Sequence, residues 1–343
     1  MQDITRLTDW AKDSLTAHGY TIHSPLEEIQ KTPYSSVIRF STSKGYVYLK
    51  QMPLALSTEA RMMQLLLQQF QANVPKVIDQ NKSLNCFLMN DCGKPLKHIL
   101  KNNFQIDLSL KAIELYTQIQ NKTKDHLNTF LELGVPDWRL EKLPILYNEI
   151  IEQEALLKSD GLTQEEFKIL HALRSDFASM CDLLQSYPTA ATLDHCDFHH
   201  GNILMDPNTE TMTVIDWAET VITHPFFSLF SYLTHTSQDH GFKETDLLFS
   251  ILKKACFKND EEALLVKKIF SIYLALGYHR LILSGSMNTD STKLKSYFNT
   301  GRNTGRFAYY FKEFIRVSVH LEPGDISRVR LTDTYRIPII TPK

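Results

Sequence analysis

The sequence predicts an α+β protein of two lobes: a small N-terminal lobe with an antiparallel sheet and one main helix, and a large lobe that is mostly helical. Two observations support this fold class. Short runs rich in β-branched and aromatic residues are concentrated in the first 95 residues, and longer segments with helical periodicity follow them. The length of 343 residues also exceeds that of an average single domain. We therefore expect lobes at 1–95 and 96–343.

The N-terminal lobe is expected to open with a helix over 3–17. Strand-like runs come next, and the predicted strands span 35–40, 46–50, 77–78 and 86–89. The first two are separated by a turn that ends at Gly45, so we expect them to form an antiparallel hairpin. Between the second and third strands, apolar residues recur at helical spacing over 59–70, and Ser57 or Thr58 is expected to cap this helix.

The C-terminal lobe shows helical periodicity over most of its length. The predicted helices span 107–133, 139–157, 163–185, 242–257, 260–284 and 292–316. A further apolar segment, 221–233, is interrupted by Thr, His, Pro and Ser and is too short to span a membrane. We expect this segment to be buried in the core.

Composition and charge exclude several classes of function. The formal net charge is -2, and no dense run of Lys and Arg marks a surface that follows phosphates, so nucleic acid is not an expected partner. No stretch reaches the roughly 18 apolar residues of a membrane span, and residues 1–15 carry acids that targeting peptides lack. Five scattered cysteines indicate a reducing compartment. We therefore expect a cytoplasmic protein without a membrane partner.

The segment 193–217, LDHCDFHHGNILMDPNTETMTVIDW, contains residues that suit phosphoryl transfer. That reaction uses a carboxylate beside the acceptor hydroxyl, and an Asn and a second Asp that bind magnesium. Asp197, Asn202 and Asp216 match these roles in order and spacing. The β-branched run 213–215, after a Pro-containing turn, predicts a hairpin that starts just after Asn202 and brings Asp216 beside it. Their oxygen ligands suit Mg²⁺ bound to a nucleotide.

Two alternatives use the same segment. Its Asp and Asn residues could cap the turns of an ordinary hairpin, as most such residues do. A zinc site would use four soft ligands that lie close together, namely His195, Cys196, His199 and His200. The catalytic Glu of zinc proteases is missing, however, and Gly201 would end a zinc-binding helix at once. The complete set with Ile215-Asp216-Trp217 favours phosphoryl transfer.

On these residues the segment resembles the aminoglycoside phosphotransferase and choline kinase superfamily, whose members usually carry His-Gly-Asp, a downstream Asn and Ile-Asp-Trp. Cys196 stands here in place of the Gly. A second segment, 134–144, is similar to one in bacterial members of the family, which extends the likeness over roughly 20–310. The resemblance implies a protein-kinase-like fold and an ATP-dependent, Mg²⁺-dependent kinase that phosphorylates a hydroxyl group of a small molecule.

The resemblance also implies roles for residues of the N-terminal lobe. Lys50 is similar to the phosphate-binding lysine of the kinase fold, and Glu59, which begins the next helix, to its acidic partner. The nucleotide lid is expected at the turn that contains Ser35 and Ser36, where hydroxyl or amide groups would replace the usual glycines. Adenine is expected at a hinge, bound by backbone groups from Met89 to Asp91.

Three departures from the family pattern leave a second hypothesis open. Besides Cys196, His224 and Ser228 stand where the family has acids that commonly brace the catalytic loop. With the glycine-poor lid, they suggest a nucleotide-binding pseudokinase. A protein kinase is a third hypothesis, although no Ala-Pro-Glu signature follows. Residues 301–343 hold eight Lys and Arg against four Asp and Glu, which does not favour a polycationic antibiotic as acceptor. The acceptor and the oligomeric state stay open.

Overall fold

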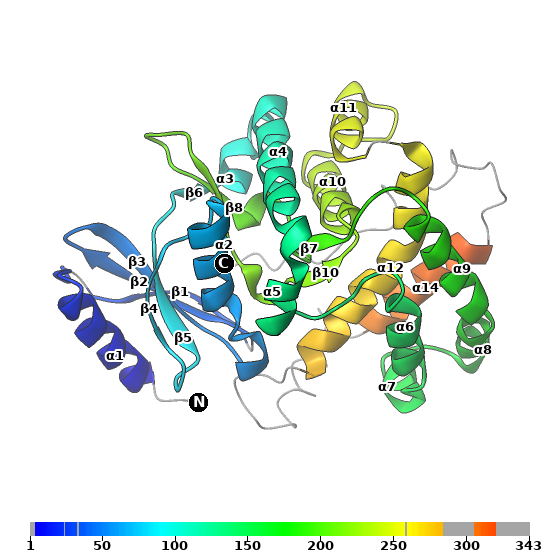
Figure 1. Ribbon diagram of the computed structural model, residues 1–343, viewed down its shortest axis with the longest axis horizontal. Helices are drawn as coiled ribbons and strands as arrows, with labels where there is room; N and C mark the ends of the chain where they lie inside the picture. Colours follow the sequence, from blue (N-terminus) through cyan, green and yellow to red (C-terminus); the bar gives the residue numbers. More distant parts are fainter. Residues whose placement is uncertain (1–3, 24, 33, 258, 284–304, 320–343) are drawn as a thin grey trace.

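The structure has two lobes. The computed structural model describes residues 4–23, 25–32, 34–257, 259–283 and 305–319. Figure 1 shows a lobe with a sheet at one end of the molecule and a larger helical lobe at the other. The predicted α+β, two-lobed fold class is therefore confirmed.

The sheet of the small lobe has five antiparallel strands in the order β1-β2-β3-β5-β4. These strands are β1 (Glu27–Lys31), β2 (Ser36–Thr42), β3 (Gly45–Gln51), β4 (Val77–Asn81) and β5 (Cys86–Asn90). The predicted hairpin is confirmed, because β2 and β3 pair from Ser36 opposite Gln51 to Thr42 opposite Gly45. β1 was not predicted, because its polar, largely exposed sequence lacks the alternation of a half-buried strand.

Two helices cover opposite faces of this sheet. α1 (Ile4–Ala17) buries Leu7 and Leu15 against one face. Successive side chains of a strand point to opposite faces. Leu49 of β3 accordingly packs on the α1 side, and its neighbour Lys50 reaches α2 (Glu59–Phe70) on the other side. This alternation places the Lys50 side chain inside the molecule, toward the large lobe.

The predicted N-cap of α2 is wrong. Thr58 has φ -72° and ψ -16°, which is already helical, and its side chain makes no capping hydrogen bond. A capping residue needs an extended conformation to turn its side-chain oxygen onto the first amides. Ser57 instead donates its hydroxyl to the carbonyl of Leu54, because a 3-10 turn at Leu54–Leu56 leads directly into the helix.

A short segment connects the lobes. β6 (Lys94–Pro95) pairs with β8 (Ile203–Met205), which pairs in turn with β9 (Met212–Val214). Gly93, just before β6, has φ 106°, and a Cβ atom there would lie 2.2 Å from the carbonyl oxygen of Met205. Only glycine lets the chain pass this close to β8.

The helices described in the large lobe are mostly shorter than predicted, although the helix predicted over 260–284 is present from Asp260 to Leu283. They are α3 (Leu96–Leu100), α4 (Ile106–Thr123), α5 (Leu127–Glu132), α6 (Leu143–Ile151), α7 (Glu154–Ser159), α8 (Gln164–Ala172), α9 (Arg174–Gln185), α10 (Phe226–His240), α11 (Leu247–Cys256), α12 (Asp260–Leu283) and α14 (Arg306–Val319). The predicted helices 107–133, 139–157 and 163–185 are each divided in two, at 124–126, 152–153 and 173. Each short helix buries its own apolar residues, such as Phe130 in α5 and Leu157 in α7, so the periodicity continues across the break.

Two further predictions in this lobe need correction. The predicted helix 242–257 begins only at Leu247, because Lys243 and Asp246 form a turn in which the Asp246 carboxylate accepts the Lys243 amide at 2.8 Å. The predicted helix 292–316 corresponds to α14 where it falls in the described residues, and positions 292–304 lie outside them. None of the described helices is both long and apolar enough to cross a membrane.

Candidate active site

The loop that contains Asp197 follows a short strand and precedes the predicted hairpin. β7 (Thr192–Asp194) ends just before His195, a 3-10 turn spans His200–Asn202, and β8 and β9 follow. The Ile215 amide donates to the Asn202 carbonyl at 2.9 Å, which extends the ladder by one residue. The hairpin is therefore confirmed, and it places Asn202 and Asp216 at the same end.

Asp197 and Asn202 are in direct contact. The Asn202 Nδ2 group donates to the Asp197 carbonyl at 2.8 Å and to Asp197 Oδ2 at 2.9 Å. Two acceptors on one side identify the amide nitrogen and turn the amide oxygen of Asn202 away from Asp197. Asn202 is buried, whereas the Asp197 side chain is 43% exposed, so the carboxylate is open to a ligand.

His199 sets the charge of Asp197. Its Nδ1 atom accepts the Gly201 amide at 2.9 Å, so the ring proton of the neutral form lies on Nε2, which is 3.5 Å from Asp197 Oδ2. Burial alone raises the pKa of Asp197, but the interactions with His199 outweigh burial and hold this pKa well below its ordinary value. Asp197 is therefore ionised at neutral pH.

Lys50 joins the two lobes through two carboxylates. Its Nζ atom lies 2.7 Å from Glu59 Oε2 and 2.6 Å from Asp216 Oδ1. Burial lowers the pKa of Lys50, but the charges of Asp216 and Glu59 outweigh burial and raise it overall. Burial raises the pKa of Glu59, and the Lys50 charge only partly offsets this. The structure thus brings together three residues that the sequence separates by up to 166 positions.

The backbone at Asp216 presents this carboxylate toward Lys50. Asp216 has φ 65°, a left-handed conformation that is uncommon outside glycine, Asn and Asp. The next amide, that of Trp217, donates to Glu59 Oε1 at 3.2 Å, and His195 Nε2 donates to the Ile215 carbonyl at 2.7 Å. The strained turn is therefore fixed from both lobes.

Of the two lid residues, Ser35 lies just before β2 and Ser36 is the first residue of that strand. The Ser35 amide donates to Thr32 Oγ1 at 2.9 Å, so this amide has a partner within the turn. Ser36 is buried and pairs with Lys31 in the sheet. The hinge residues Met89 and Asp91 lie at the end of β5, where the Asp91 amide donates to the Tyr46 carbonyl at 3.2 Å.

The histidines of the alternative zinc site have separate partners. His200 is buried, and its Nε2 atom lies 2.6 Å from the Tyr232 hydroxyl and 3.2 Å from that of Ser109. The His195 ring is bound to the Ile215 carbonyl on the other side of the loop. The rings of His195 and His200 are therefore held by hydrogen bonds to other groups of the protein.

Sequence reasoning missed a buried carboxylate one position before the motif. Asp194 is fully buried and accepts hydrogen bonds from Ser228, Tyr273 and the Cys196 amide. Cys196 has φ 68°, which suits the glycine usual at this position, and the chain adopts it with a cysteine. The only sequence signal was an acid within a short apolar strand, next to the loop.

Glu219 and Arg280 lie beside the loop. Burial, and then the charges of Asp197 and Asp216, raise the pKa of Glu219, while Arg280 opposes the shift. The Arg280 guanidinium donates to the carbonyl of Glu219 at 2.7 Å and to that of Thr220 at 3.1 Å. A third acid thus lies near the carboxylates of Asp197 and Asp216.

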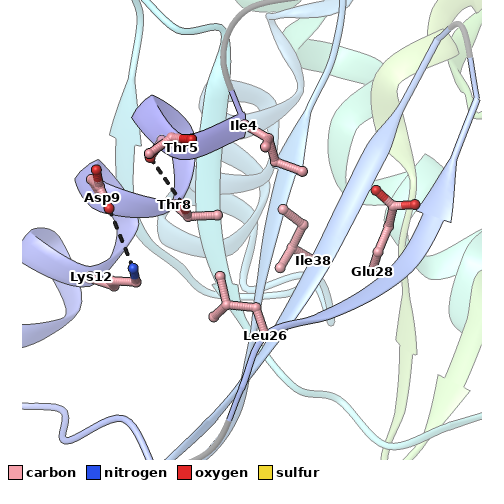
Figure 2. Close-up of a pocket in the computed structure, with 8 residues that line it drawn as sticks. All are labelled: Ile4, Thr5, Thr8, Asp9, Lys12, Leu26, Glu28 and Ile38. Carbon is pink, nitrogen blue, oxygen red and sulfur yellow. Dashed lines mark hydrogen bonds and ion pairs between the residues drawn. The ribbon is translucent and has the colours of Figure 1, made fainter.

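A separate cavity lies on the outer face of the small lobe. Its volume is about 300 Å³. Figure 2 shows it between α1 and the strands β1 and β2, with Ile4, Leu26 and Ile38 among its lining residues. None of the candidate site residues lines it. The cavity is therefore distinct from the site around Lys50 and Asp197.

Solved structures share this fold. The choline kinase LicA from Streptococcus pneumoniae has a TM-score of 0.58 at 12% identity, over 90% of this chain and 99% of that one. The GDP complex of wild-type aminoglycoside 2'-phosphotransferase-IIIa has a TM-score of 0.54 at 15% identity, over 91% and 98%. An ethanolamine kinase from Plasmodium vivax has a TM-score of 0.54 at 14% identity, over 92% and 89%.

The sequence comparison identifies the family. None of the curated proteins matches this chain. A family model described as the phosphotransferase enzyme family matches residues 33–248, which is more than half of the chain and includes the segment from Lys50 to Asp216. The predicted resemblance is confirmed: this chain belongs to the phosphotransferase enzyme family.

Proposed function

We propose that this protein is an ATP-dependent kinase that phosphorylates a hydroxyl group of a small molecule. The observation that carries the proposal is the buried ion pair of Lys50 with Glu59 and its second ion pair with the half-exposed Asp216, next to the hydrogen-bonded pair of Asp197 and Asn202. Phosphoryl transfer needs positioning and charge stabilisation more than covalent chemistry from the protein. These residues supply a cation, two oxygen ligands and a carboxylate at one place.

Mg²⁺ fits the ligands that Asn202 and Asp216 provide. Because the Asn202 nitrogen faces Asp197, its amide oxygen is the group left for a cation. The Asp216 side chain is 45% exposed and accepts from Lys50 through Oδ1. One carboxylate and one amide oxygen match the hard ligands that Mg²⁺ takes beside substrate phosphates. The ion would neutralise charge on the transferring phosphoryl group.

The two lobes would have different roles in the reaction. In residues 1–95, Lys50 would bind the nucleotide phosphates and Glu59 would hold Lys50 in place, while the backbone from Met89 to Asp91 would bind adenine. Ser35 and Ser36 would cover the phosphates through their hydroxyl groups, since the Ser35 amide is already bonded to Thr32. Residues 96–343 would provide the catalytic loop and the acceptor site.

Asp197 would act on the acceptor. Its carboxylate is ionised and partly exposed, so it accepts a hydrogen bond from the acceptor hydroxyl and orients that oxygen toward the γ-phosphate. The hydroxyl proton moves to Asp197 as the new P–O bond forms and the bond to the ADP oxygen breaks.

All five cysteines are free of disulfide bonds, which supports the proposal of a reducing, cytoplasmic setting.

The test is ADP release from Mg-ATP across a broad panel of small alcohols. We expect an acceptor-dependent rate for the wild type and a rate at least about 100-fold lower for Asp197→Asn, which keeps the shape of the side chain without a proton acceptor. Protein that binds Mg-ATP but releases no ADP with any alcohol would contradict the proposal.

One observation favours a second candidate, a nucleotide-binding pseudokinase. The lid turn lacks glycine, and its Ser35 amide is bound to Thr32, so the turn offers fewer backbone donors to a phosphate than a glycine-rich loop does. Thermal stabilisation by ATP that Asp216→Ala leaves unchanged, together with absence of turnover, would support this candidate over the kinase.

A further inference from the structure

Asp194 holds a buried carboxylate at the base of the catalytic loop. Its side chain is 0% exposed. Oδ1 accepts the Ser228 hydroxyl at 2.8 Å, the Cys196 amide at 3.1 Å and the Tyr273 hydroxyl, while Oδ2 accepts the Ser228 amide at 2.9 Å. These donors come from the loop, from α10 and from α12. One carboxylate therefore joins the loop to two helices.

The first turn of α10 favours a carboxylate at this position. The N-cap of α10 is Pro225, which has no side chain able to cap the helix. The Ser228 amide in the first turn would then lack an intrahelical partner. Asp194 accepts this amide from the neighbouring strand, and a negative charge is favoured at a helix N-terminus. The strand pairing of β7 with β10, in which Asp194 lies opposite Val221, brings the carboxylate there.

The contact continues to the proposed catalytic residue. The Cys196 amide donates to Asp194 Oδ1 and, at 3.2 Å, to Ser228 Oγ, and the next residue is Asp197. Cys196 is held at φ 68°, a left-handed conformation that is unfavourable for a residue other than glycine. If the Cys196 amide lost the Asp194 carboxylate as an acceptor, this turn of the loop would be less stable. The Asp197 carboxylate would then be displaced together with the turn.

We propose that Asp194 is the positioning residue of the catalytic loop and replaces the acid that the family pattern places at 228. Ser228 donates its hydroxyl to the Asp194 carboxylate, so the two positions are in direct contact. In this chain the carboxylate of the contact is therefore on the strand and the hydroxyl is on the helix. The inference rests on the proposed kinase function, because it assigns Asp194 the task of holding Asp197.

The test exchanges the carboxylate at position 194 and the hydroxyl at position 228. Asp194→Ser removes it, Ser228→Asp adds one at the other side of the contact, and the double variant D194S/S228D exchanges them. We expect D194S to lower kcat roughly 100-fold with little change in KM for ATP, since a displacement of about 1 Å costs about that much. The double variant should regain at least about tenfold of that loss, because the two sites are in contact and their effects are not additive.

Two controls keep the test specific. Glu262→Gln alters another buried acid, in the first turn of α12, which accepts the Thr189 hydroxyl at 2.7 Å; we expect it to leave kcat unchanged. Tyr273→Phe removes one donor and keeps the Asp194 carboxylate, so it remains measurable if D194S does not fold. We expect Y273F to lower kcat by roughly tenfold, in line with the loss of one hydrogen bond to a charged group.

The outcomes separate this inference from the proposed function. If the wild type phosphorylates no alcohol, the kinase proposal fails, and thermal unfolding still tests the brace. In that case D194S and S228D should each lower the unfolding temperature, and the double variant should recover most of the loss. A double variant no better than D194S in both kcat and unfolding temperature, or a D194S protein with wild-type kcat, would overturn the role of Asp194.

Discussion

Lys50 is charged although its side chain is nearly removed from water. It lies 2.7 Å from Glu59 and 2.6 Å from Asp216, and these two charges, one on each lobe, make the charged form stable. A buried ion pair contributes little net stability compared with apolar packing, but removing one partner leaves the other charge uncompensated. Removing Lys50, the residue proposed to bind the phosphates, should therefore destabilise the folded protein.

Lys50→Met tests this argument. We expect the variant to lose about 3 kcal/mol or more of unfolding free energy at pH 8, because Glu59 stays buried without a cation. The loss should be smaller at pH 5, where Glu59, whose pKa burial raises to about 7, is protonated. Urea unfolding at both pH values measures this, alongside Mg-ATP binding by calorimetry.

Lys267→Met is the matched control for Lys50. Lys267 is also buried, and it pairs with Glu244 at 3.3 Å, away from the candidate site. We expect this variant to lose stability while it keeps Mg-ATP affinity. Wild-type affinity in Lys50→Met would contradict the phosphate-binding role of Lys50.

Asp194 gives the stability a specific pH dependence. Burial raises the pKa of Asp194 to about 6, an effect that its hydrogen bonds from Tyr273 and Ser228 oppose. In the unfolded chain the pKa of Asp is about 3.9, so the folded state binds the proton more tightly. Protonation of Asp194 therefore stabilises the folded protein most strongly below about pH 4. This contribution to the unfolding free energy is lost as the pH rises through about 6.

Urea unfolding of wild type and Asp194→Asn from pH 4 to 7 checks this. We expect the difference in unfolding free energy, wild type minus variant, to fall by about 2 kcal/mol over this range. The titratable side chains that face Asp194 are Tyr116 on α4, Cys196 in the loop and Tyr273 on α12, and burial raises the pKa of all three. None of them titrates in this window, so a difference independent of pH would contradict the assignment.

At the scale of elements, the connection between the lobes depends on one glycine. A Cβ at position 93 would lie 2.2 Å from the Met205 carbonyl oxygen, and the backbone there has φ 106°. We expect Gly93→Ala to cost about 3 kcal/mol, from the left-handed conformation and from the clash with β8 together. Chemical unfolding measures the cost.

Gly241→Ala provides the matched comparison. Gly241 also has positive φ, 69°, but a Cβ there would meet open space. This variant should lose only roughly 1 kcal/mol, from backbone conformation alone. Equal losses in the two variants would show that the close approach of residue 93 to β8 does not matter.

Some elements were predictable from the sequence and others were not, for physical reasons. The hairpins at 36–51 and 203–214 follow from β-branched runs and turn residues, and both were predicted. α10 was predicted only as a buried segment, because Phe226 to Thr234 are all buried and leave no polar face to give a helical period. The breaks that divide α4 from α5 and α6 from α7 do not interrupt the apolar pattern, so they were missed.

At the scale of the whole molecule, the candidate site is assembled from both lobes. Lys50 and Glu59 come from the sheet lobe, and Asp197, Asn202 and Asp216 from the loop and hairpin beyond β7. The motif indicated Asp197, Asn202 and Asp216 because their types and spacing are specific, and the family resemblance indicated Lys50 and Glu59. The role of Asp194 was not predictable, since its partners Ser228 and Tyr273 lie 34 and 79 positions away and meet it only through the fold. The boundary at residue 95 stays a prediction.

The central claim is that this two-lobed site transfers one phosphoryl group from ATP to an alcohol. The most direct measurement incubates the protein with Mg-ATP and a mixture of small alcohols and records, by mass spectrometry, which of them gains one phosphate. We expect one acceptor or a related group of acceptors to gain it in an amount equal to the ADP formed, and Asp197→Asn to abolish the gain. ADP formation without a phosphorylated alcohol, or equal product from wild type and Asp197→Asn, would contradict the account.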